Sequence, residues 1–197
     1  MIKVGVIGAN GFLGLELLRI LSIHPKVEIA KILKRENDIE EEFSHLSSLN
    51  LNDNQTSSIE DFKNLDCVFL SLPHGYANEY VKELINKVKI IDLSADYRID
   101  DINSYKEYYK SSFNPEVQNN FDYGFIENNL VNIQKATNIA NPGCFALASQ
   151  LAILPFHTLI DNISITAITG SSGGGKMSTS KNHHSVRSKD IFSYNVN

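Results

Sequence analysis

The chain has 197 residues, of which 42% are hydrophobic, and a formal net charge of −5. This length and apolar content predict a well-buried core, and one domain plus part of another. Acidic and basic residues are interspersed and the balance is acidic, which argues against binding to nucleic acid or to an anionic membrane surface. No run is long enough to span a bilayer, and Met1 leads into a strand-like segment rather than a signal peptide. We therefore expect a cytoplasmic protein that acts on small molecules and contacts other protein subunits.

Apolar runs typical of buried parallel strands recur over 3–8, 27–33, 65–72, 89–94 and 136–141. Segments with helical periodicity lie between several of them, over 12–22, 41–49 and 76–87. Strands that alternate with helices predict an α/β fold with a doubly wound, mostly parallel Rossmann-type sheet and right-handed crossovers.

The pattern changes at Cys144, where a long apolar helical stretch over 144–160 begins. A strand over 163–170, a Gly/Ser loop, a polar segment and a strand over 191–196 follow. One helix and two strands cannot bury a core of their own. We therefore predict an α/β domain over 1–143 and an incomplete α+β domain over 144–197.

Three glycines stand between the first strand and the first helix. Glycine at this place lets the backbone turn tightly and approach a pyrophosphate, which the helix N-terminus stabilises. The spacing is G-x-x-G-x-x-G, which differs from the generic dinucleotide motif and resembles semialdehyde dehydrogenases. A tight turn without a ligand is the alternative. The residues expected to contact the cofactor are Gly8, Asn10, Gly11, Phe12 and Gly14.

Basic residues follow the second predicted strand. An NAD site usually offers an acid there for the ribose hydroxyls, whereas this chain presents Lys31, Lys34 and Arg35 before Glu36. A 2′-phosphate suits basic residues better, so the sequence favours NADP(H), held in part by Lys34 and Arg35. Solvated lysines at a strand end are the alternative.

The chain has two cysteines in different contexts, which predicts neither a disulfide framework nor a metal site. Cys67 lies in an apolar run and is expected to be an inert core residue. Cys144 follows Asn-Pro-Gly and precedes an apolar helix, whose aligned peptide dipoles would stabilise a thiolate. Taken alone, Cys144 is better interpreted as a small buried residue that starts a helix.

A nicotinamide domain together with an activated cysteine narrows the expected chemistry. The thiolate attacks an acyl phosphate, phosphate leaves, and a hydride converts the thioester to a thiohemiacetal that collapses to the aldehyde. Simple alcohol dehydrogenation needs no such thiol.

Several longer motifs resemble one family. They are G-A-N-G-F-L-G (8–14), L-P-H-G (72–75), D-L-S-A-D-Y-R (92–98), Y-G-F-I-E (123–127), N-P-G-C-F-A (141–146) and G-S-S-G-G-G-K (170–176). In this order they resemble the N-acetyl-γ-glutamyl-phosphate reductases of arginine biosynthesis, which belong to the semialdehyde dehydrogenase superfamily. The resemblance implies NADPH-dependent reduction of N-acetyl-γ-glutamyl phosphate to N-acetyl-L-glutamate 5-semialdehyde and phosphate, through a thioester on Cys144.

The same resemblance implies that 1–143 is an NADP-binding domain and that 144–197 is the first part of a substrate and dimerisation domain. It also implies further site residues. The cofactor cleft would be lined by Pro73, His74 and Gly75, and the loop with Ser171, Gly173 and Gly174 would face the nicotinamide and the reacting centre. The expected substrate contacts are Asn141, Lys176 and Arg187, although the two cations could equally be solvated surface charges. Asp96 and Arg98 would shape the cleft, or form an exposed ion pair of little energetic value. Neither His74 nor His183 nor His184 matches the position of the family's acid/base.

Two departures from the family pattern matter. Ile126 stands where the family commonly has proline. The family's H-x-H segment, which supplies the catalytic base, would follow Asn197, together with the strands of the subunit interface. We therefore expect an N-terminal part of a homo-oligomeric enzyme, in which loss of the base would cost about 10²- to 10⁴-fold in rate.

Two other functions fit the sequence. One is the reductase of carrier-bound aminoadipyl phosphate in lysine biosynthesis, which shares these motifs. The other is a non-catalytic NADP-binding remnant. An in-frame H-x-H in the genomic sequence after Asn197 would indicate an enzyme, and a stop codon would favour the remnant.

Overall fold

The computed structural model describes residues 1–33, 54–109, 115–175, 183–188 and 191. The chain forms two units, Met1–Ile163 and Ser164–Asn197. The predicted helix over 41–49 lies outside the described residues, as does nearly all of the predicted strand over 191–196.

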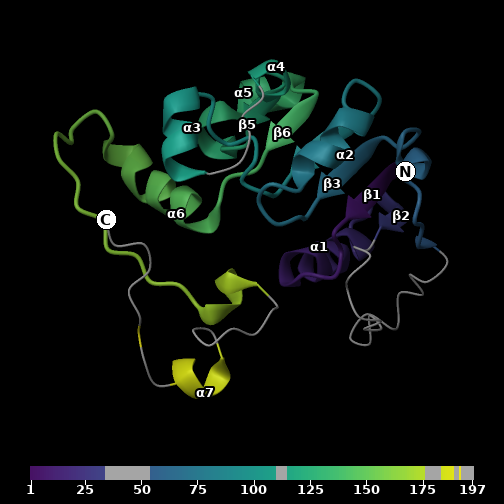
Figure 1. The fold of residues 1–197 in the computed structure, drawn as a ribbon. Helices are drawn as coiled ribbons and strands as arrows, with labels where there is room; N and C mark the ends of the chain where they lie inside the picture. The colour runs from purple at the N-terminus through teal and green to yellow at the C-terminus, as the bar shows by residue number, and fades with distance from the viewer. Residues whose placement is uncertain (34–53, 110–114, 176–182, 189–190, 192–197) are drawn as a thin grey trace. The chain divides into compact units, whose positions relative to one another are not determined.

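The first unit contains a six-stranded parallel sheet with the order β2-β1-β3-β4-β6-β5 (Figure 1). The strands are β1 (Ile2–Ile7), β2 (Val27–Leu33), β3 (Cys67–Leu70), β4 (Lys89–Asp92), β5 (Phe121–Tyr123) and β6 (Asn138–Ala140). The predicted doubly wound sheet is confirmed. Strand β5 was not predicted, because a strand this short shows no period of its own.

The helices of the first unit lie between the strands and after β6. They are α1 (Phe12–Ser22), η3 (Ile59–Phe62), α2 (Ala77–Leu84), α3 (Ile102–Tyr108), α4 (Pro115–Gln118), α5 (Ile126–Lys135), α6 (Cys144–Ile153) and η4 (Leu154–Phe156). Both predicted helices that fall on described residues between the strands, α1 and α2, are confirmed. Helix α6 is shorter than the predicted apolar stretch, because Pro155 lies just after it and lacks the N–H that an α-helix needs.

The second unit contains η5 (Ser171–Gly174) and α7 (His184–Arg187). The predicted strand over 163–170 is wrong, since these described residues form no strand and are exposed. An apolar alternating segment becomes a strand only when a neighbouring strand accepts its hydrogen bonds. In the described part of the chain, no helix is long and apolar enough to cross a membrane.

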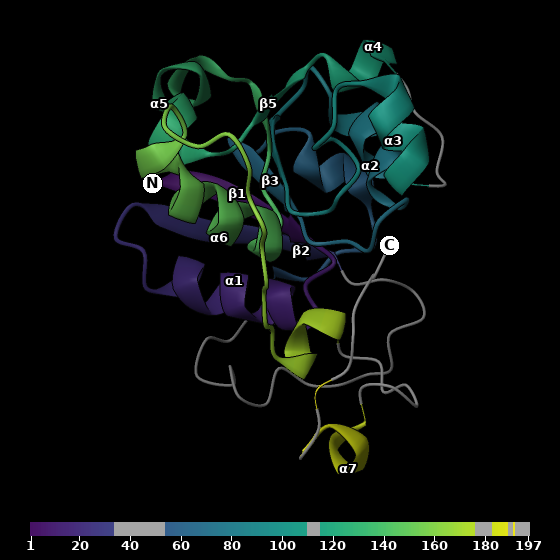
Figure 2. The same cartoon turned by 90° about the vertical axis from the view of Figure 1, so that its left-hand side faces the viewer.

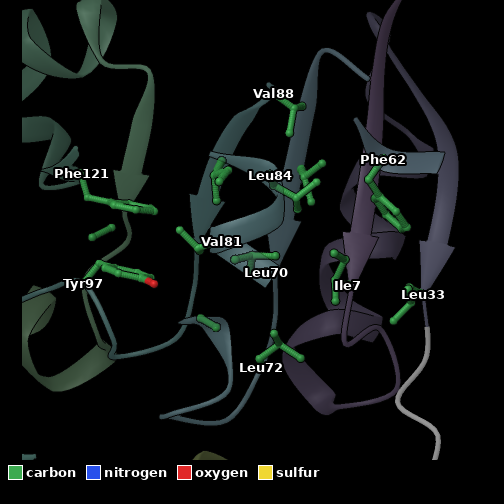
Figure 3. Packing of buried hydrophobic residues seen from close by; sticks show 14 residues of the cluster. Ile7, Leu33, Phe62, Leu70, Leu72, Val81, Leu84, Val88, Tyr97 and Phe121 are labelled. Carbon is green, nitrogen blue, oxygen red and sulfur yellow. The ribbon is translucent and has the colours of Figure 1, made fainter. Parts of the chain in front are cut away.

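Apolar side chains cover both faces of the sheet. One face packs on α1, and its cluster contains Val4, Val6, Leu18, Leu21 and Ile32. The other face packs on α2, and its cluster contains Ile7, Leu70, Val81, Leu84 and Ile90. Figure 2 shows α1 and α2 on opposite sides of the strands. Figure 3 shows the second cluster, which the stacked rings of Tyr97 and Phe121 extend with centroids 4.2 Å apart.

Backbone hydrogen bonds align the loops at the carboxyl edge of the sheet. In four pairs of neighbouring strands, the last carbonyl oxygen of one strand accepts a hydrogen bond from the first residue after the other strand. The pairs are Gly8 N to Leu33 O at 2.9 Å, Ser71 N to Ile7 O at 2.8 Å, Leu93 N to Leu70 O at 2.9 Å, and Asn141 N to Asp92 O at 2.8 Å. The loops after β1, β3, β4 and β6 therefore begin side by side.

Asp92, the last residue of β4, has a fully buried side chain. Its carboxylate accepts hydrogen bonds from Ser94 N at 3.0 Å and Ser94 Oγ at 2.7 Å. These bonds favour the charged form, but loss of hydration on burial outweighs them and raises the pKa of Asp92 to about 7. The carboxyl edge thus contains a carboxyl group that titrates near neutral pH.

Replacement of Gly8 by alanine should destabilise the first unit by about 2 to 4 kcal/mol. Gly8 has φ +82°, and a Cβ there would lie 2.3 Å from the carbonyl oxygen of Ser71. The matched control is Gly11→Ala, because Gly11 has φ −73° and no atom within 4 Å of the added Cβ. Urea unfolding measures both, and an equal loss in the two variants would contradict the argument.

Replacement of Asp92 by asparagine should flatten the pH dependence of stability. A raised pKa means that the folded chain retains a proton that the unfolded chain has lost above its ordinary value of 3.8. This contribution to stability is complete below pH 3.8 and is lost as the pH rises through about 7. Asp92→Asn cannot ionise, so its stability relative to the unchanged chain should rise from pH 5 to pH 8.

The measurement is urea unfolding across that range, with the exposed Asp161→Asn as control. Parallel curves for Asp92→Asn and the unchanged chain would show that Asp92 is already ionised in the folded state at low pH.

Candidate functional site

The strand order reverses between β1 and β3. The chain leaves β1 for β2 on one side, and leaves β3 for β4 on the other. In doubly wound sheets a crevice opens at the carboxyl ends of strands at such a point, and ligands bind there. The two predicted cofactor segments, 8–14 and 73–75, follow β1 and β3 and so meet at this crevice.

The glycine turn after β1 suits an anion. A Cβ on Gly14 would lie 2.7 Å from the carbonyl oxygen of Gly8, so glycine allows α1 to begin directly against the turn. Gly11 is the N-cap of α1, where no side chain caps the helix and the first turn carries no acid. The free N–H groups and the positive end of the helix dipole are therefore left for a negatively charged group such as a phosphate.

Two other predicted residues of this turn differ in burial. Phe12 is exposed at the start of α1. Asn10 is buried, and its Oδ1 has no hydrogen-bond partner among the described residues. A buried acceptor without a partner is costly, so Asn10 fits a site whose bound group donates a hydrogen bond to it. The residues present therefore fit a dinucleotide.

The loop after β3 is held by Asp96, whose side chain is buried. The carboxylate accepts hydrogen bonds from Gly75 N at 2.6 Å and Ala77 N at 3.0 Å, and it contacts His74 Nδ1 at 2.5 Å. The ring of His74 also packs on Tyr109, with centroids 4.3 Å apart. Asp96 thus fixes the loop and the first turn of α2.

Pro73 and Gly75 of the same loop are exposed, and Gly75 has φ +90° with no atom within 4 Å of an added Cβ. The described residues show no ion pair between Asp96 and Arg98. The alternative of an exposed ion pair is therefore wrong, because Asp96 is buried and uses its oxygens on the loop.

Cys144 is the first residue of α6, and its side chain is exposed. It follows the turn Asn141–Pro142–Gly143 at the carboxyl end of β6, and Gly143 O accepts the first helical bond from Leu147 N at 2.8 Å. The side-chain amide of Asn141 donates to Pro142 O at 3.1 Å, within the turn. The predicted position of Cys144 at a helix N-terminus is confirmed, and its alternative as a buried residue is wrong.

Cys67 behaves differently. It lies in β3 with 7% of its surface exposed, and burial raises the pKa of its thiol to about 11. Cys67 therefore stays a protonated core residue near neutral pH, as predicted.

A pocket of about 420 Å³ opens beside the turn Asn141–Pro142–Gly143. Its lining includes Arg98, Tyr109, Tyr123, Gly143 and Gln150. Of these, Tyr109 and Gln150 were missed by sequence reasoning, since neither stands in a recognisable motif. A larger hollow of about 1030 Å³ lies near Met1, His24 and Lys26, and none of the predicted site residues lines it.

The remaining predicted residues lie outside the described residues or in the second unit. Lys34, Arg35 and Lys176 lie outside the described residues. Ser171, Gly173 and Gly174 form η5 in the second unit and are exposed. Arg187 ends α7, whose N-cap His183 accepts a hydrogen bond from Ser185 N.

Comparisons with known proteins agree with this architecture. Residues 3–136 match the family described as semialdehyde dehydrogenase, NAD binding domain, and residues 144–197 match semialdehyde dehydrogenase, dimerisation domain. The chain is 39% identical to an N-acetyl-γ-glutamyl-phosphate reductase of Karelsulcia muelleri over 100% of its own length and 58% of the relative's.

Two further similarities are informative. The chain is 36% identical to a Thermococcus kodakarensis protein provisionally named LysW-L-2-aminoadipate/LysW-L-glutamate phosphate reductase, over 98% of the chain and 58% of the relative. Aspartate semialdehyde dehydrogenase from Francisella tularensis shares the fold, with a TM-score of 0.50 at 16% identity over 80% of this chain and 41% of that one.

The chain thus spans a little over half the length of the curated relatives, and the predicted resemblance is confirmed. With its NAD binding domain matched from residue 3 to residue 136, the chain belongs to the semialdehyde dehydrogenase family.

Proposed function

We propose that this chain carries the cofactor-binding and nucleophile-bearing parts of a reductase that converts N-acetyl-γ-glutamyl phosphate to N-acetyl-L-glutamate 5-semialdehyde and phosphate with NADPH. The observation that carries the proposal is the exposed Cys144 at the first residue of α6, on the same sheet edge as the uncapped glycine turn. The boundary at 143/144 would separate the cofactor domain from the substrate domain.

The cofactor would be held by residues of several loops. Its phosphates would lie on the turn that contains Gly8, Asn10, Gly11, Phe12 and Gly14, beside the loop with Pro73, His74 and Gly75. Lys34 and Arg35 would bind the 2′-phosphate, and Ser171, Gly173 and Gly174 would face the nicotinamide. When bound, NADPH supplies the hydride that reduces the acyl group to the aldehyde level.

Cys144 would perform the covalent step. The thiolate Sγ forms a bond to the acyl carbon, the bond from that carbon to the phosphate oxygen breaks, and phosphate leaves with the electron pair. The helix N-terminus stabilises the thiolate that attacks. Asn141, Lys176 and Arg187 are the proposed substrate contacts, since an amide and two cations suit a carboxylate and a phosphate.

A second candidate function is reduction of a carrier-linked aminoadipyl or glutamyl phosphate. The Thermococcus kodakarensis relative favours it, at 36% identity over 98% of the chain. The covalent chemistry is the same, and only the group beyond the acyl phosphate differs. A comparison of kcat/KM for acetylated and carrier-linked substrates decides between them, because the correct substrate should be preferred by orders of magnitude.

Assembly and location follow from the same proposal. The match of residues 144–197 to a dimerisation domain supports a homo-oligomer. The cytoplasm is the expected compartment, where reduced thiols persist.

Replacement of Cys144 by serine should abolish turnover of the acyl phosphate, because a serine hydroxyl does not ionise near neutral pH and is a far weaker nucleophile than a thiolate. The measurement is NADPH oxidation with N-acetyl-γ-glutamyl phosphate, in the complete polypeptide that the gene encodes. The control is Cys67→Ser, which should retain its activity per folded molecule even if the substitution lowers the folded fraction. Normal turnover in Cys144→Ser would rule out the proposed nucleophile.

Replacement of Lys34 and Arg35 by glutamine should weaken NADPH binding about tenfold or more and leave NADH binding nearly unchanged, because only NADPH carries the 2′-phosphate. Fluorescence titration of the two cofactors measures this. The matched control is Lys26→Gln, an exposed charge just before β2. If the preference for NADPH survived the double substitution, the two residues would be ordinary surface charges.

A further inference from the structure

Two adjacent residues of the turn after β4 hold the start of α2. Gly75 N and Ala77 N donate to the two carboxylate oxygens of Asp96, at 2.6 and 3.0 Å, and Asp96 is 2% exposed. The hydroxyl of Tyr97 donates to Asn78 Oδ1 at 2.6 Å. The loop after β3 and the first turn of α2 are therefore fixed by side chains that stand 19 to 21 positions further along the chain.

The ring of His74 is held at one edge and on one face. Its Nδ1 lies 2.5 Å from Asp96 Oδ1. A carboxylate oxygen only accepts, so Nδ1 has to carry the hydrogen in this contact. The ring packs on Tyr109 with centroids 4.3 Å apart, and the ring of Tyr105 lies 6.3 Å away. His74 keeps 29% of its side chain exposed, so the ring has a fixed orientation and still offers surface to a ligand.

Two helices begin beside the crevice between β1 and β3, and their first turns differ in charge. The start of α1 has no acid in its first turn and no side-chain cap. The start of α2 has Glu79 in its first turn, and its first residue, Ala77, donates its N–H to the carboxylate of Asp96. The positive end of the α2 dipole is thus met by negative charge from the protein itself. A phosphate is therefore favoured at α1 and disfavoured at α2.

The strand order assigns the two halves of a dinucleotide to the two sides of the crevice. In the proposed function the 2′-phosphate binds after β2, and the hydride passes to a group on Cys144 after β6. Strand β3 lies on the β6 side of the crevice. Arg98 Nε, in the turn after β4, donates to the carbonyl oxygen of Asn141 at 2.7 Å. The side that disfavours phosphate is thus the side nearer the cysteine, where the uncharged nicotinamide and ribose of NADPH belong.

We propose that Asp96 is a positioning residue for the cofactor, which holds His74 so that its ring contacts the nicotinamide riboside half of NADPH. The proposal rests on the cofactor-binding part of the function given above. Asp96 is buried and acts through Nδ1 of His74 and through the backbone that follows it. The ring meets the cofactor at its opposite edge, where the nitrogen of a neutral imidazole accepts a hydrogen bond from a ribose hydroxyl.

The test compares NADPH with 2′,5′-ADP, which keeps the 2′-phosphate and the adenosine and lacks the nicotinamide riboside. Calorimetry on the complete polypeptide that the gene encodes measures both dissociation constants. We expect Asp96→Asn to weaken NADPH binding about tenfold and to leave 2′,5′-ADP binding within about twofold, because an amide nitrogen would face the N–H donors that Asp96 now accepts. His74→Ala should have the same selective effect.

The double variant separates positioning from an independent effect. If Asp96 acts through His74, Asp96→Asn in the His74→Ala background should weaken NADPH binding further by less than about threefold, since the side chain that it positions is already gone. A loss of about a hundredfold in the double variant would mean that the two residues act independently, which overturns the proposal.

The controls are Asp161→Asn and His24→Ala, which alter an exposed acid and an exposed histidine outside the predicted site and should leave both dissociation constants unchanged. Equal weakening of the two ligands by Asp96→Asn, or no weakening of NADPH, overturns the proposal, whatever happens to the melting temperature. If Asp96→Asn does not fold, His74→Ala decides. Selective loss of NADPH binding in that variant supports the proposal, and unchanged NADPH binding overturns it.

Cofactor binding needs neither the substrate nor the thiol, so its result is independent of the reductase assay. Turnover that survives Cys144→Ser would refute the proposed nucleophile and leave the role of Asp96 intact. Equally tight NADPH binding by the unchanged protein and by Asp96→Asn would refute the role of Asp96 alone. Failure of the unchanged protein to bind NADPH would refute the proposed function, and the role of Asp96 with it.

Discussion

The hydrogen bonds between strand ends and neighbouring loops are the constraint on which the site depends. Leu33, Ile7, Leu70, Asp92 and Ala140 stand in one row across the sheet. Their carbonyl oxygens would lack partners if the next loop began one residue later, and a buried carbonyl without a partner is costly. The same bonds that satisfy the sheet therefore bring the glycine turn, the His74 loop and the Cys144 turn to one edge.

Two buried carboxylates at this edge are stabilised in different ways. Asp96 receives two backbone N–H groups and the ring of His74, so its oxygens are engaged by the loop that it organises. Asp92 receives both of its hydrogen bonds from Ser94. Loss of hydration on burial outweighs these bonds and raises the pKa of Asp92. Ser94 Oγ also accepts a bond from Asp96 N at 3.1 Å, which joins the two acids into one turn. This short turn contains the charged groups that order the loop after β3 and, through Arg98, the turn before Cys144.

The parts of the site that depend only on adjacent residues could be predicted from the sequence. Gly8 and Gly14 are needed where a strand turns tightly into a helix, and Asn-Pro-Gly before Cys144 starts a helix, so both features stand in a few adjacent residues. The sheet was predictable from its apolar runs. The partners of Asp96 and Arg98 were not, because they lie about 20 and 43 positions away in the sequence. The strand predicted over 163–170 was wrong for a related reason. Alternating residues do not show whether a partner strand is present to accept the hydrogen bonds.

Helix α6 has no buried residue, although most of its residues are apolar. Phe145, Leu147 and Ile153 are half-buried, and its other apolar side chains are exposed. Apolar side chains gathered on one exposed element mark a contact surface. The direction of Cys144 is set by the turn before the helix and not by the helix, so the thiol keeps its place whether or not the later turns of α6 are covered.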